Sequence, residues 1–402
     1  MRSLQSPYTP GSGARPPVFA GREPIMARAE AMLTRVANTR RAAPQPMVMT
    51  GPRGLGKTVT LGEIAATAGA RGFVVCPVAF DAVSDNTQLL ALTLAKSTAP
   101  LMRKGSRAAQ AFVRRLAALS IELNAGVVRI TSPASAQFAP PSDANARQVL
   151  GDLLGKAAFL ATDRDRLGLV VLIDELQEAT RHQLVTVCNA IQDTTDAPLA
   201  VFMAGLPTTP DKLMSAASFS ERFDYQELTR LDDAAAERAL VEPSVAVGVR
   251  WEPEAVRLTL IEASGSPYMI QKLGDEAWSA AAQPGGPIDS CAAITAIDRT
   301  RHDLGVGMFR GRWAKASPRE RELITAIACV ADDAGVARTA DIVRLLHTTT
   351  PRLSQTRRSL LDKDLIESPG RGLVCFTMPA FGDYVLETTG VARSGPGMPP
   401  QG

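Results

Sequence analysis

The chain of 402 residues is 45% hydrophobic and 21% charged, and it carries a formal net charge of +3. This length exceeds one hydrophobic core, so we expect two or three packed units, and the small net charge neither requires nor excludes an anionic partner. The longest apolar run, near residues 169–173, is too short to span a membrane and the N-terminus lacks the apolar block of a signal peptide, so we expect a cytoplasmic protein with no membrane partner.

Residues 1–228 contain two predicted parts. Residues 1–20 are rich in Pro and Gly, which predicts a flexible arm. In residues 21–228, strands predicted at 46–50, 73–78, 167–173 and 199–204 alternate with helices predicted from about 22 and at 57–70, 86–96, 103–122, 144–161 and 179–193. This alternation predicts an α/β fold with a parallel sheet and helices on both faces.

A glycine-rich loop lies between the first predicted strand and its helix. Its sequence GPRGLGKT satisfies the pattern G-x-x-x-x-G-K-[ST]. The glycines let successive backbone N–H groups point into one concavity, and the next helix presents its positive N-terminus to phosphate. Lys57 is expected to reach the β and γ phosphates, and Thr58 to ligate Mg²⁺. The predicted ATP-binding residues are Gly51, Pro52, Arg53, Gly54, Leu55, Gly56, Lys57, Thr58 and Val59.

Two acidic residues follow the apolar strand in LVVLIDELQEA. The strand places Asp174 at the carboxyl edge of the sheet, where we expect it to hold Mg²⁺. Glu175 is then expected to face the γ-phosphate and activate water. The alternative interpretation is a helix start after a strand, where acidic residues are favoured in any case.

Together these motifs resemble AAA+ ATPases of the bacterial and archaeal type that are similar to origin-recognition proteins. GPRGLGKT matches their Walker A element, and LVVLIDELQ looks like their Walker B element, with Gln177 after it. The resemblance covers about residues 8–387, and it implies a P-loop core, ATP and Mg²⁺ as cofactors, and ATP hydrolysis. It also implies that the proline-rich segment PYTPGSGARPPVFAGRE, which precedes the nucleotide site, lies near adenine. Val18 and Phe19 are therefore candidates for base contacts.

The segment after the fourth predicted strand carries further candidates. VFMAGLP resembles the sensor strand of this family, and the resemblance makes Arg222 a phosphate-sensing or finger-like arginine, acting in its own chain or on another copy. The alternative is a surface arginine paired with Glu221 or Asp224. The family expects a polar residue at the end of the sensor strand, whereas Ala204 and Gly205 occupy that place.

Residues 229–312 read as helices, which predicts a separate helical lid. SGSPYMIQKLGDEAW resembles the lid helix of the family, and Gly265 and Pro267 form the G-x-P of signal-transduction ATPases of the STAND type. This likeness makes Pro267 a candidate nucleotide contact. The helix has no sensor arginine, and Lys272 is a weak substitute, so fast hydrolysis coupled around a ring is not implied.

Residues 313–390 predict a winged helix, followed by a disordered tail at 391–402. Helices are expected at 319–330, 339–346 and 351–363, and a hairpin follows with its tip at 369–372. The third helix of such a module can enter the major groove of DNA, so donors on its exposed face are candidate DNA contacts. These are Arg352, Gln355, Arg358 and Ser359 on the helix and Arg371 at the tip of the wing.

Further basic clusters could extend a DNA surface, although solvated faces are the simpler account. They are Arg299, Arg301, Arg310, Arg312 and Lys315 before the winged helix, and Arg103, Lys104, Arg107, Arg114 and Arg115 on an earlier helix. The five cysteines have no close pair and His182, His302 and His347 are far apart, which fits neither a zinc site nor a nucleophile pair.

Two functions remain open. One is an ATPase that acts on duplex DNA, favoured by the order of core, lid and winged helix. The other is a nucleotide-gated signalling switch with slow turnover that binds a protein partner or another copy of the chain, favoured by the missing polar sensor and the G-x-P. Winged helices also serve as protein-contact modules, and a polar outer face is the default for any surface helix.

Overall fold

The computed structural model describes residues 5–11, 13–102, 143–281, 286–332, 334–378 and 380–394. The chain divides into two compact units, each with its own hydrophobic core. The α/β unit comprises Arg22–Gly51 and Lys57–Leu228, and the helical unit comprises Met1–Gly21, Pro52–Gly56 and Thr229–Gly402. The predicted basic helix with Arg103, Lys104, Arg107, Arg114 and Arg115 lies outside the described residues.

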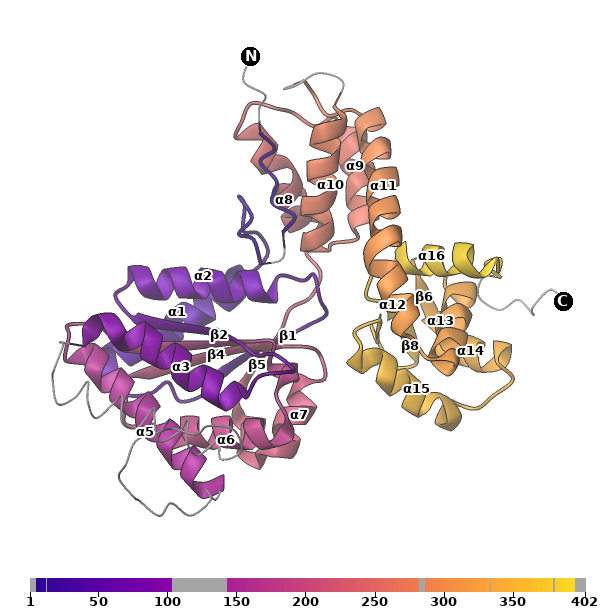
Figure 1. Ribbon diagram of the computed structural model, residues 1–402. Helices are drawn as coiled ribbons and strands as arrows, with labels where there is room; N and C mark the ends of the chain where they lie inside the picture. Colours follow the sequence, from indigo (N-terminus) through magenta and orange to yellow (C-terminus); the bar gives the residue numbers. More distant parts are fainter. Residues whose placement is uncertain are drawn as a thin grey trace, which may run out of the picture. The chain divides into compact units, whose positions relative to one another are not determined.

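The α/β unit is built on a five-stranded parallel sheet in the order β2-β3-β4-β1-β5 (Figure 1). Its strands are β1 (Met47–Thr50), β2 (Val74–Ala79), β3 (Leu169–Asp174), β4 (Leu199–Gly205) and β5 (Asp224–Glu227). Strands β1 and β4 are buried throughout, as expected for a parallel sheet covered on both faces. Thr50 pairs with both Gly205 and Glu227, so the carboxyl ends of three strands meet at one edge.

Helices cover both faces of this sheet, as the sequence predicts (Figure 1). On one face lie α1 (Glu23–Thr39) and α2 (Lys57–Ala70), and on the other α3 (Asn86–Thr98), α5 (Asp143–Thr162) and α6 (Arg181–Gln192). A capping box of Thr180 and Gln183 fixes the start of α6, because each side chain satisfies a backbone N–H of the other. Short elements complete the unit: η1 (Ala99–Leu101), η2 (Leu176–Glu178), α7 (Thr209–Ala216) and η3 (Ser218–Arg222).

The helical unit begins its folded part with a four-helix segment, defined as α8 (Asp233–Val245), α9 (Pro253–Ala263), α10 (Pro267–Ala280) and α11 (Ser290–Leu304). Asp232, Ser266 and Asp289 cap the first, third and fourth of these helices through their side chains. Helix α11 continues through a π-helical turn, η4 (Gly305–Phe309), into α12 (Arg310–Lys315). No described helix of the chain has the length and apolar character needed to cross a membrane.

A winged helix forms the C-terminal part of the helical unit. Its helices are α13 (Pro318–Val330), α14 (Thr339–Leu345) and α15 (Thr350–Asp362), and its strands β6 (Val336–Arg338), β7 (Ile366–Glu367) and β8 (Leu373–Phe376) pair antiparallel in the order β6-β8-β7. Helix α16 (Ala380–Thr389) follows. The three predicted helices and the hairpin are present, whereas β6 was not predicted from the sequence.

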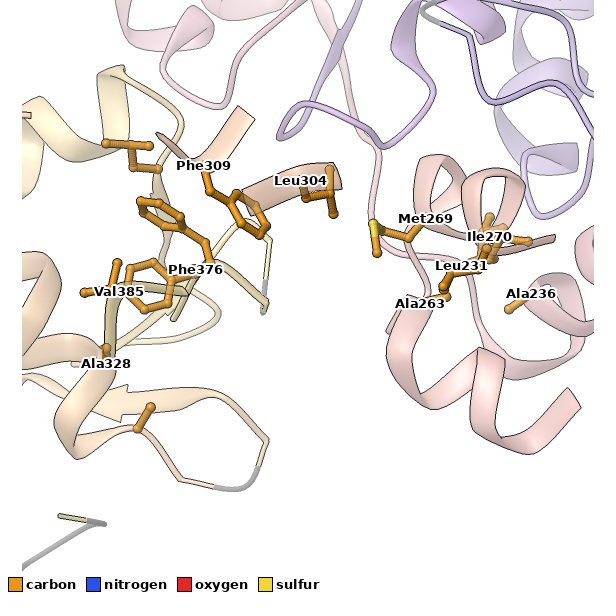
Figure 2. Close-up of a cluster of buried hydrophobic side chains, with 14 of the residues drawn as sticks. Leu231, Ala236, Ala263, Met269, Ile270, Leu304, Phe309, Ala328, Phe376 and Val385 are labelled. Atoms are coloured by element: carbon orange, nitrogen blue, oxygen red, sulfur yellow. The ribbon is translucent and has the colours of Figure 1, made fainter. Parts of the chain in front are cut away.

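Buried side chains of the four-helix segment and of the winged helix belong to one hydrophobic cluster, and Figure 2 labels members from both parts. Phe309, on the π-helical turn, packs against Phe381 of α16 with ring centroids 5.4 Å apart, and Phe381 packs edge to face on Phe376 of β8 at 5.5 Å. Burial of each ring stabilises the fold by roughly 2 to 3 kcal/mol. The winged helix is therefore packed against the end of the preceding helices and is not joined to them by a flexible linker alone.

The N-terminal arm is anchored at Tyr8. Residues 13–20 form no helix or strand, but the Tyr8 side chain is 4% exposed within the core of the helical unit. Its hydroxyl donates to the Leu240 carbonyl at 2.5 Å and accepts from the Trp251 indole N–H at 3.0 Å, and burial raises the pKa of Tyr8 to about 12. A Cβ at Gly274 would lie 2.6 Å from the tyrosine ring, so glycine makes room for it. This corrects the expectation of a freely flexible arm.

Candidate nucleotide-binding site

The phosphate loop leaves the sheet at the end of β1. Gly51 is the first loop residue, and a Cβ there would lie 2.7 Å from the backbone oxygen of Leu228, so only glycine fits. Gly56 has a φ of +87°, in the left-handed region that favours glycine. Glycine is thus required at the two motif positions for different reasons: a close backbone approach at Gly51 and a left-handed backbone conformation at Gly56.

Lys57 and Thr58 begin α2, directly after the loop. The Lys57 side chain is buried, and its ammonium donates to the Gly51 carbonyl at 2.7 Å. A buried ammonium must be paired with acceptors, and phosphate oxygens are stronger acceptors than a carbonyl. Val59, the next predicted residue, is half-buried. Helix α2 also presents its N-terminus, which attracts anions.

Thr58 and Asp174 converge although they come from different elements. The Thr58 hydroxyl donates to one carboxylate oxygen of Asp174 at 2.6 Å. The other oxygen accepts from the N–H of Glu175 at 2.8 Å, which fixes the carboxylate at the last residue of β3. A hydroxyl and a carboxylate at this spacing are oxygen donors of the kind that Mg²⁺ prefers beside phosphates, so these residues fit the metal.

Glu175 has a φ of +53°, which is unusual for a residue other than glycine. Its carboxylate accepts a hydrogen bond from the side-chain amide of Gln177. The oxygen of that amide accepts from the N–H of Leu206, just beyond β4, at 3.1 Å. Gln177 therefore connects the candidate water activator with the next strand of the sheet, a role that its sequence motif does not indicate.

Arg222 lies at the other edge of the sheet. It ends η3, two residues before β5, whereas the phosphate loop follows the opposite end of β1; the four paired residues of β1 and β5 span about 13 Å. Arg222 borders a cavity of about 230 Å³ together with Phe219 and Phe223. Asp224, its suggested ion-pair partner, pairs with Arg28 at 2.7 Å. Within the α/β unit, Arg222 is thus distant from Lys57.

The loop residues Pro52–Gly56 belong to the helical unit. Pro52 and Leu55 are buried, while Arg53 and Gly54 are exposed. The Gly54 carbonyl accepts from the N–H of Tyr268 in the first turn of α10 at 3.3 Å. The predicted loop thereby contacts the helix that begins at Pro267.

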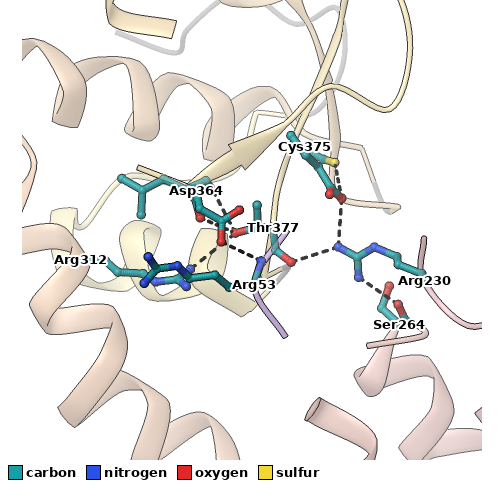
Figure 3. A network of polar contacts seen from close by, with 9 residues as sticks. Arg53, Arg230, Ser264, Arg312, Asp364, Cys375 and Thr377 are labelled. Atoms are coloured by element: carbon teal, nitrogen blue, oxygen red, sulfur yellow. Dashed lines mark hydrogen bonds and ion pairs between the residues drawn. The ribbon is translucent and has the colours of Figure 1, made fainter. Parts of the chain in front are cut away.

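A second contact ties the loop to the winged helix (Figure 3). The Arg53 backbone N–H donates to the carboxylate of Asp364 at 2.8 Å. Asp364 follows α15, is 2% exposed and has a φ of +55°. Burial lowers the pKa of Arg312, while the Asp364 charge counteracts this effect and the Arg53 charge adds to it. The Asp364 carboxylate is therefore placed where it can offset a buried guanidinium.

Arg230 makes the other half of this network (Figure 3). Its guanidinium donates to the carbonyls of Ser264 at 2.9 Å and Thr377 at 3.1 Å, and it pairs with Glu367 at 3.1 Å. Burial, together with the Glu367 charge, raises the pKa of Cys375 to about 12, so this thiol stays protonated at neutral pH. Arg230 thus links the turn before α10 to the wing, and sequence patterns gave no signal for it.

The candidate base contacts lie in the helical unit. Val18 is half-buried against its core and Phe19 is half-buried. Pro267 is the first residue of α10, after the N-cap Ser266. Lys272, the weak substitute for a sensor arginine, pairs with Glu276 at 2.7 Å and Asp303 at 2.9 Å. These pairs hold the Lys272 ammonium within the four-helix segment.

The candidate DNA contacts are exposed, with one exception. Arg352, Gln355 and Arg358 lie on the outer face of α15, and Arg371 lies in the turn between β7 and β8. Ser359 is half-buried, and its hydroxyl donates to Glu320 of α13 at 2.7 Å. The prediction of Ser359 as an exposed donor was wrong because α13, a neighbour that helical spacing does not reveal, engages its hydroxyl.

Two arginines of the basic cluster before the winged helix are engaged by other residues of the chain. Arg301 makes two hydrogen bonds to Glu262, at 2.8 and 2.6 Å, and Arg312 is desolvated near Asp364. Arg301 is exposed but paired, whereas Arg312 is half-buried. Arg299, Arg310 and Lys315 are exposed.

Comparisons with known proteins agree with this geometry. Residues 18–203 match the family model described as an AAA ATPase domain, and residues 306–385 match a model described as a domain of unknown function. Comparison with curated proteins finds no match. A Walker-type ATPase of Pyrococcus abyssi aligns with 92% of this chain and 97% of its own at 14% identity, with a TM-score of 0.58.

The ORC2 protein of Aeropyrum pernix, solved in an ADP form, aligns with 94% of this chain and 97% of its own at 13% identity, with a TM-score of 0.54. At such identities the likeness concerns the fold. Residues 18–203 of this chain thus resemble an AAA ATPase domain, and the chain shares the AAA+ P-loop fold of these two solved structures.

Proposed function

We propose that the chain is a Mg²⁺-dependent ATPase that couples ATP binding and hydrolysis to its winged helix in association with duplex DNA. The observation that carries the ATPase part is the 2.6 Å hydrogen bond between Thr58 and Asp174, beside the buried ammonium of Lys57. In this proposal Thr58 and Asp174 would bind the metal and Lys57 the phosphate, at the carboxyl edge of a parallel sheet. This is the edge at which open α/β sheets bind ligands.

Each residue then has a defined task. Lys57 exchanges its bond to the Gly51 carbonyl for phosphate oxygens, and the loop N–H groups bind the remaining phosphate charge. Thr58 and Asp174 would hold Mg²⁺, which offsets the negative charge of the phosphates. Glu175 orients the attacking water and accepts its proton. These steps need no residue beyond those at the ends of β1 and β3.

Arg222 fits this scheme only in an assembly. Its position at the amino edge of the sheet excludes contact with phosphates held by Lys57 of the same chain. We therefore propose that Arg222 acts as a finger-like arginine on the nucleotide bound to another copy of the chain.

Support for DNA as the partner comes from the winged helix. Arg352, Gln355 and Arg358 present donors on the outer face of α15, and Arg371 adds a cation on the wing. Guanidinium groups in this arrangement suit phosphate and base-edge contacts. Arg358 also lies 3.6 Å from Asp362, a pair between exposed groups that is weak enough to be exchanged for phosphate.

The second candidate, a nucleotide-gated switch with a protein partner, is favoured by one contact. Asp364 of the winged helix accepts a hydrogen bond from the backbone of Arg53 in the phosphate loop. A loop that rearranges around phosphate would change this hydrogen bond. The conformation of the winged helix would then depend on whether nucleotide is bound. In this alternative, DNA has no effect on turnover.

The deciding experiment measures ATP hydrolysis by the full chain with and without duplex DNA, with Glu175→Gln as the blank. Substitution of Arg352, Arg358 and Arg371 by Ala is preferable to truncation, because Phe309 and Phe381 share a core with the winged helix. Stimulation by DNA that this triple variant loses supports the proposal. Turnover that DNA leaves unchanged favours the nucleotide-gated switch.

A further inference from the structure

Gln177 occupies a junction between two strands of the AAA ATPase domain. It lies in the 3₁₀ turn after β3 and its side chain is 9% exposed. Its amide N–H group donates to the Glu175 carboxylate, and its amide oxygen accepts from the Leu206 N–H at 3.1 Å. Its backbone carbonyl accepts from the Lys212 ammonium at 3.1 Å. The residue is thus held on three sides within the α/β unit.

The chemistry of the two partners fixes the orientation of the amide. An ionised carboxylate only accepts hydrogen bonds, and a backbone N–H only donates them. The Gln177 amide must therefore turn its nitrogen to Glu175 and its oxygen to Leu206; the reverse orientation would lose both bonds. The glutamine amide thus offers a donor at one end and an acceptor at the other, as these two partners require.

The end of β4 carries no polar side chain of its own. A Cβ at Gly205 would overlap the hydroxyl of Thr209, and the preceding residue is Ala204. The Thr209 side chain is 1% exposed, and among the described residues its hydroxyl has no hydrogen-bond partner. The polar bridge between β3 and β4 is instead built from the β3 side, by Gln177.

Glu175 depends on such a bridge. Its positive φ is a backbone conformation that costs on the order of 1 kcal/mol for a residue other than glycine. Its side chain is half-buried and has several rotatable bonds, so without a partner it would sample several rotamers. The amide of Gln177 holds one carboxylate oxygen and leaves the other available to a water molecule.

We propose that Gln177 is a positioning residue for Glu175: it orients the carboxylate that activates water and takes the structural place of the polar residue absent from the end of β4. This inference rests on the proposed ATPase function. Gln177 does not touch the nucleotide in this scheme. It acts through Glu175, because its amide ties the Glu175 carboxylate to the end of β4.

Three full-length variants test the inference. Gln177→Ala removes both side-chain hydrogen bonds. Gln177→Glu keeps the size and an acceptor for the Leu206 N–H, but it replaces the donor to Glu175 by a second carboxylate. Gln192→Ala, at the exposed end of α6, is the matched control. Each variant is assayed for ATP hydrolysis and for binding of a fluorescent ATP analogue.

The expected result separates binding from turnover. Gln177→Ala should lower kcat by about 100-fold, as for a misplaced catalytic group, while the Kd for the analogue stays within about threefold. Gln177→Glu should also lower kcat with little change in the Kd, because it replaces the donor to Glu175 by a second acceptor. A merely structural glutamine would not separate turnover from binding in this way. Gln192→Ala should match the wild type.

Other outcomes would overturn the inference. Unchanged or faster hydrolysis by Gln177→Ala would show that the bridge is dispensable or restrains Glu175. A kcat of Gln177→Glu equal to that of the wild type would show that the bond to Glu175 has no part in turnover. Failure of the proposed function is a different result: the wild type itself would then neither bind the analogue nor hydrolyse ATP.

Discussion

The hydroxyl of Thr58 donates a hydrogen bond of 2.6 Å to the carboxylate of Asp174, although 116 residues separate the two in sequence. The sheet order explains this proximity. Strand β4 pairs with both β1 and β3, and all three run parallel, so the residues after β1 and at the end of β3 meet at the same edge. The pair supplies the most direct tests of the proposed chemistry.

Asp174→Asn should remove the effect of Mg²⁺ on ATP binding. The amide keeps the size of the side chain but loses the negative charge that a hard divalent cation requires. We expect the affinity for ATP to be nearly the same in Mg²⁺ and in EDTA, whereas the wild type binds more tightly with Mg²⁺. Titration of a fluorescent ATP analogue measures both. An undiminished Mg²⁺ effect would place the metal elsewhere.

Lys57→Ala should abolish ATP binding, whereas Glu175→Gln should keep binding and lose hydrolysis by a factor of about 10² to 10⁴. The difference arises because the ammonium binds phosphate charge, while the carboxylate is needed only when water attacks. Lys96→Ala, an exposed lysine in the last turn of α3, is the control for loss of one positive charge. Binding by Lys57→Ala at the wild-type affinity would refute the site assignment.

If the winged helix binds DNA, the affinity for duplex DNA should fall with salt concentration, with a slope that reflects the number of phosphate contacts. Each guanidinium that contacts a phosphate should contribute nearly one unit to the slope of log K against log salt concentration. Replacement of Arg352 or Arg371 by Ala should reduce the slope by about one, whereas Arg257→Ala, on α9, should leave it unchanged. Arg257 is exposed and pairs with Glu254. Fluorescence anisotropy with labelled duplex at several salt concentrations measures the slope, and equal slopes for all variants would contradict the DNA interface.

Asp364 provides a test of communication between the loop and the winged helix. Asp364→Ala removes the acceptor of the Arg53 N–H and a charge near the desolvated Arg312. Loss of the partner of a buried charge costs about 3 kcal/mol or more, so thermal unfolding should begin at a lower temperature. In the nucleotide-gated alternative, hydrogen exchange of residues 362–367 in the wild type should also change when ATP is added. Exchange that ATP leaves unchanged would speak against that alternative.

Glu320 makes the winged helix sensitive to acid. Burial opposes its charge, but the Lys363 ammonium at 2.7 Å and bonds from Ser317 and Ser359 outweigh this and lower the pKa of Glu320 to about 2. Because the pKa in the folded state is below the ordinary value, the stabilisation is complete above about pH 4.5 and is lost as the pH falls towards 2. It amounts to at most about 3 kcal/mol.

Glu320→Gln should therefore reduce this acid dependence. Calorimetric melting of the full chain between pH 3 and 7 should show a wild-type advantage at neutral pH that shrinks below about pH 4.5. A constant difference across this range would mean that the ionised form of Glu320 is not the stabilising species.

The sequence predicted those features that depend on contiguous patterns. The phosphate loop, the strand that ends at Asp174 and the helices of the winged helix each have a local periodicity or motif, and all occur in the structure. Strand β5 was not predicted, because its sequence DYQE is polar and its residues are half-buried or exposed. An edge strand with little apolar surface has no periodicity to detect.

Features that depend on distant contacts could not be predicted. The bond from Arg53 to Asp364 joins residues 311 positions apart, and nothing near either residue indicates the other. Gln177 was noted beside the Walker B element, but its bond to Leu206 depends on how β3 and β4 pair. The inward turns of Arg312 and Ser359 likewise depend on neighbours supplied by other elements.

The anchored Tyr8 has a consequence for where this protein can be cut. The family match begins at residue 18, and a chain shortened to that boundary would lack the ring that fills the space beside Gly274 and hydrogen-bonds to Leu240 and Trp251. A hole of aromatic size and a displaced indole N–H would remain among the helices of the helical unit. The boundary drawn by sequence similarity and the boundary of the folding unit thus differ, and the residues before the recognised domain complete the interior of a segment more than two hundred positions further along the chain.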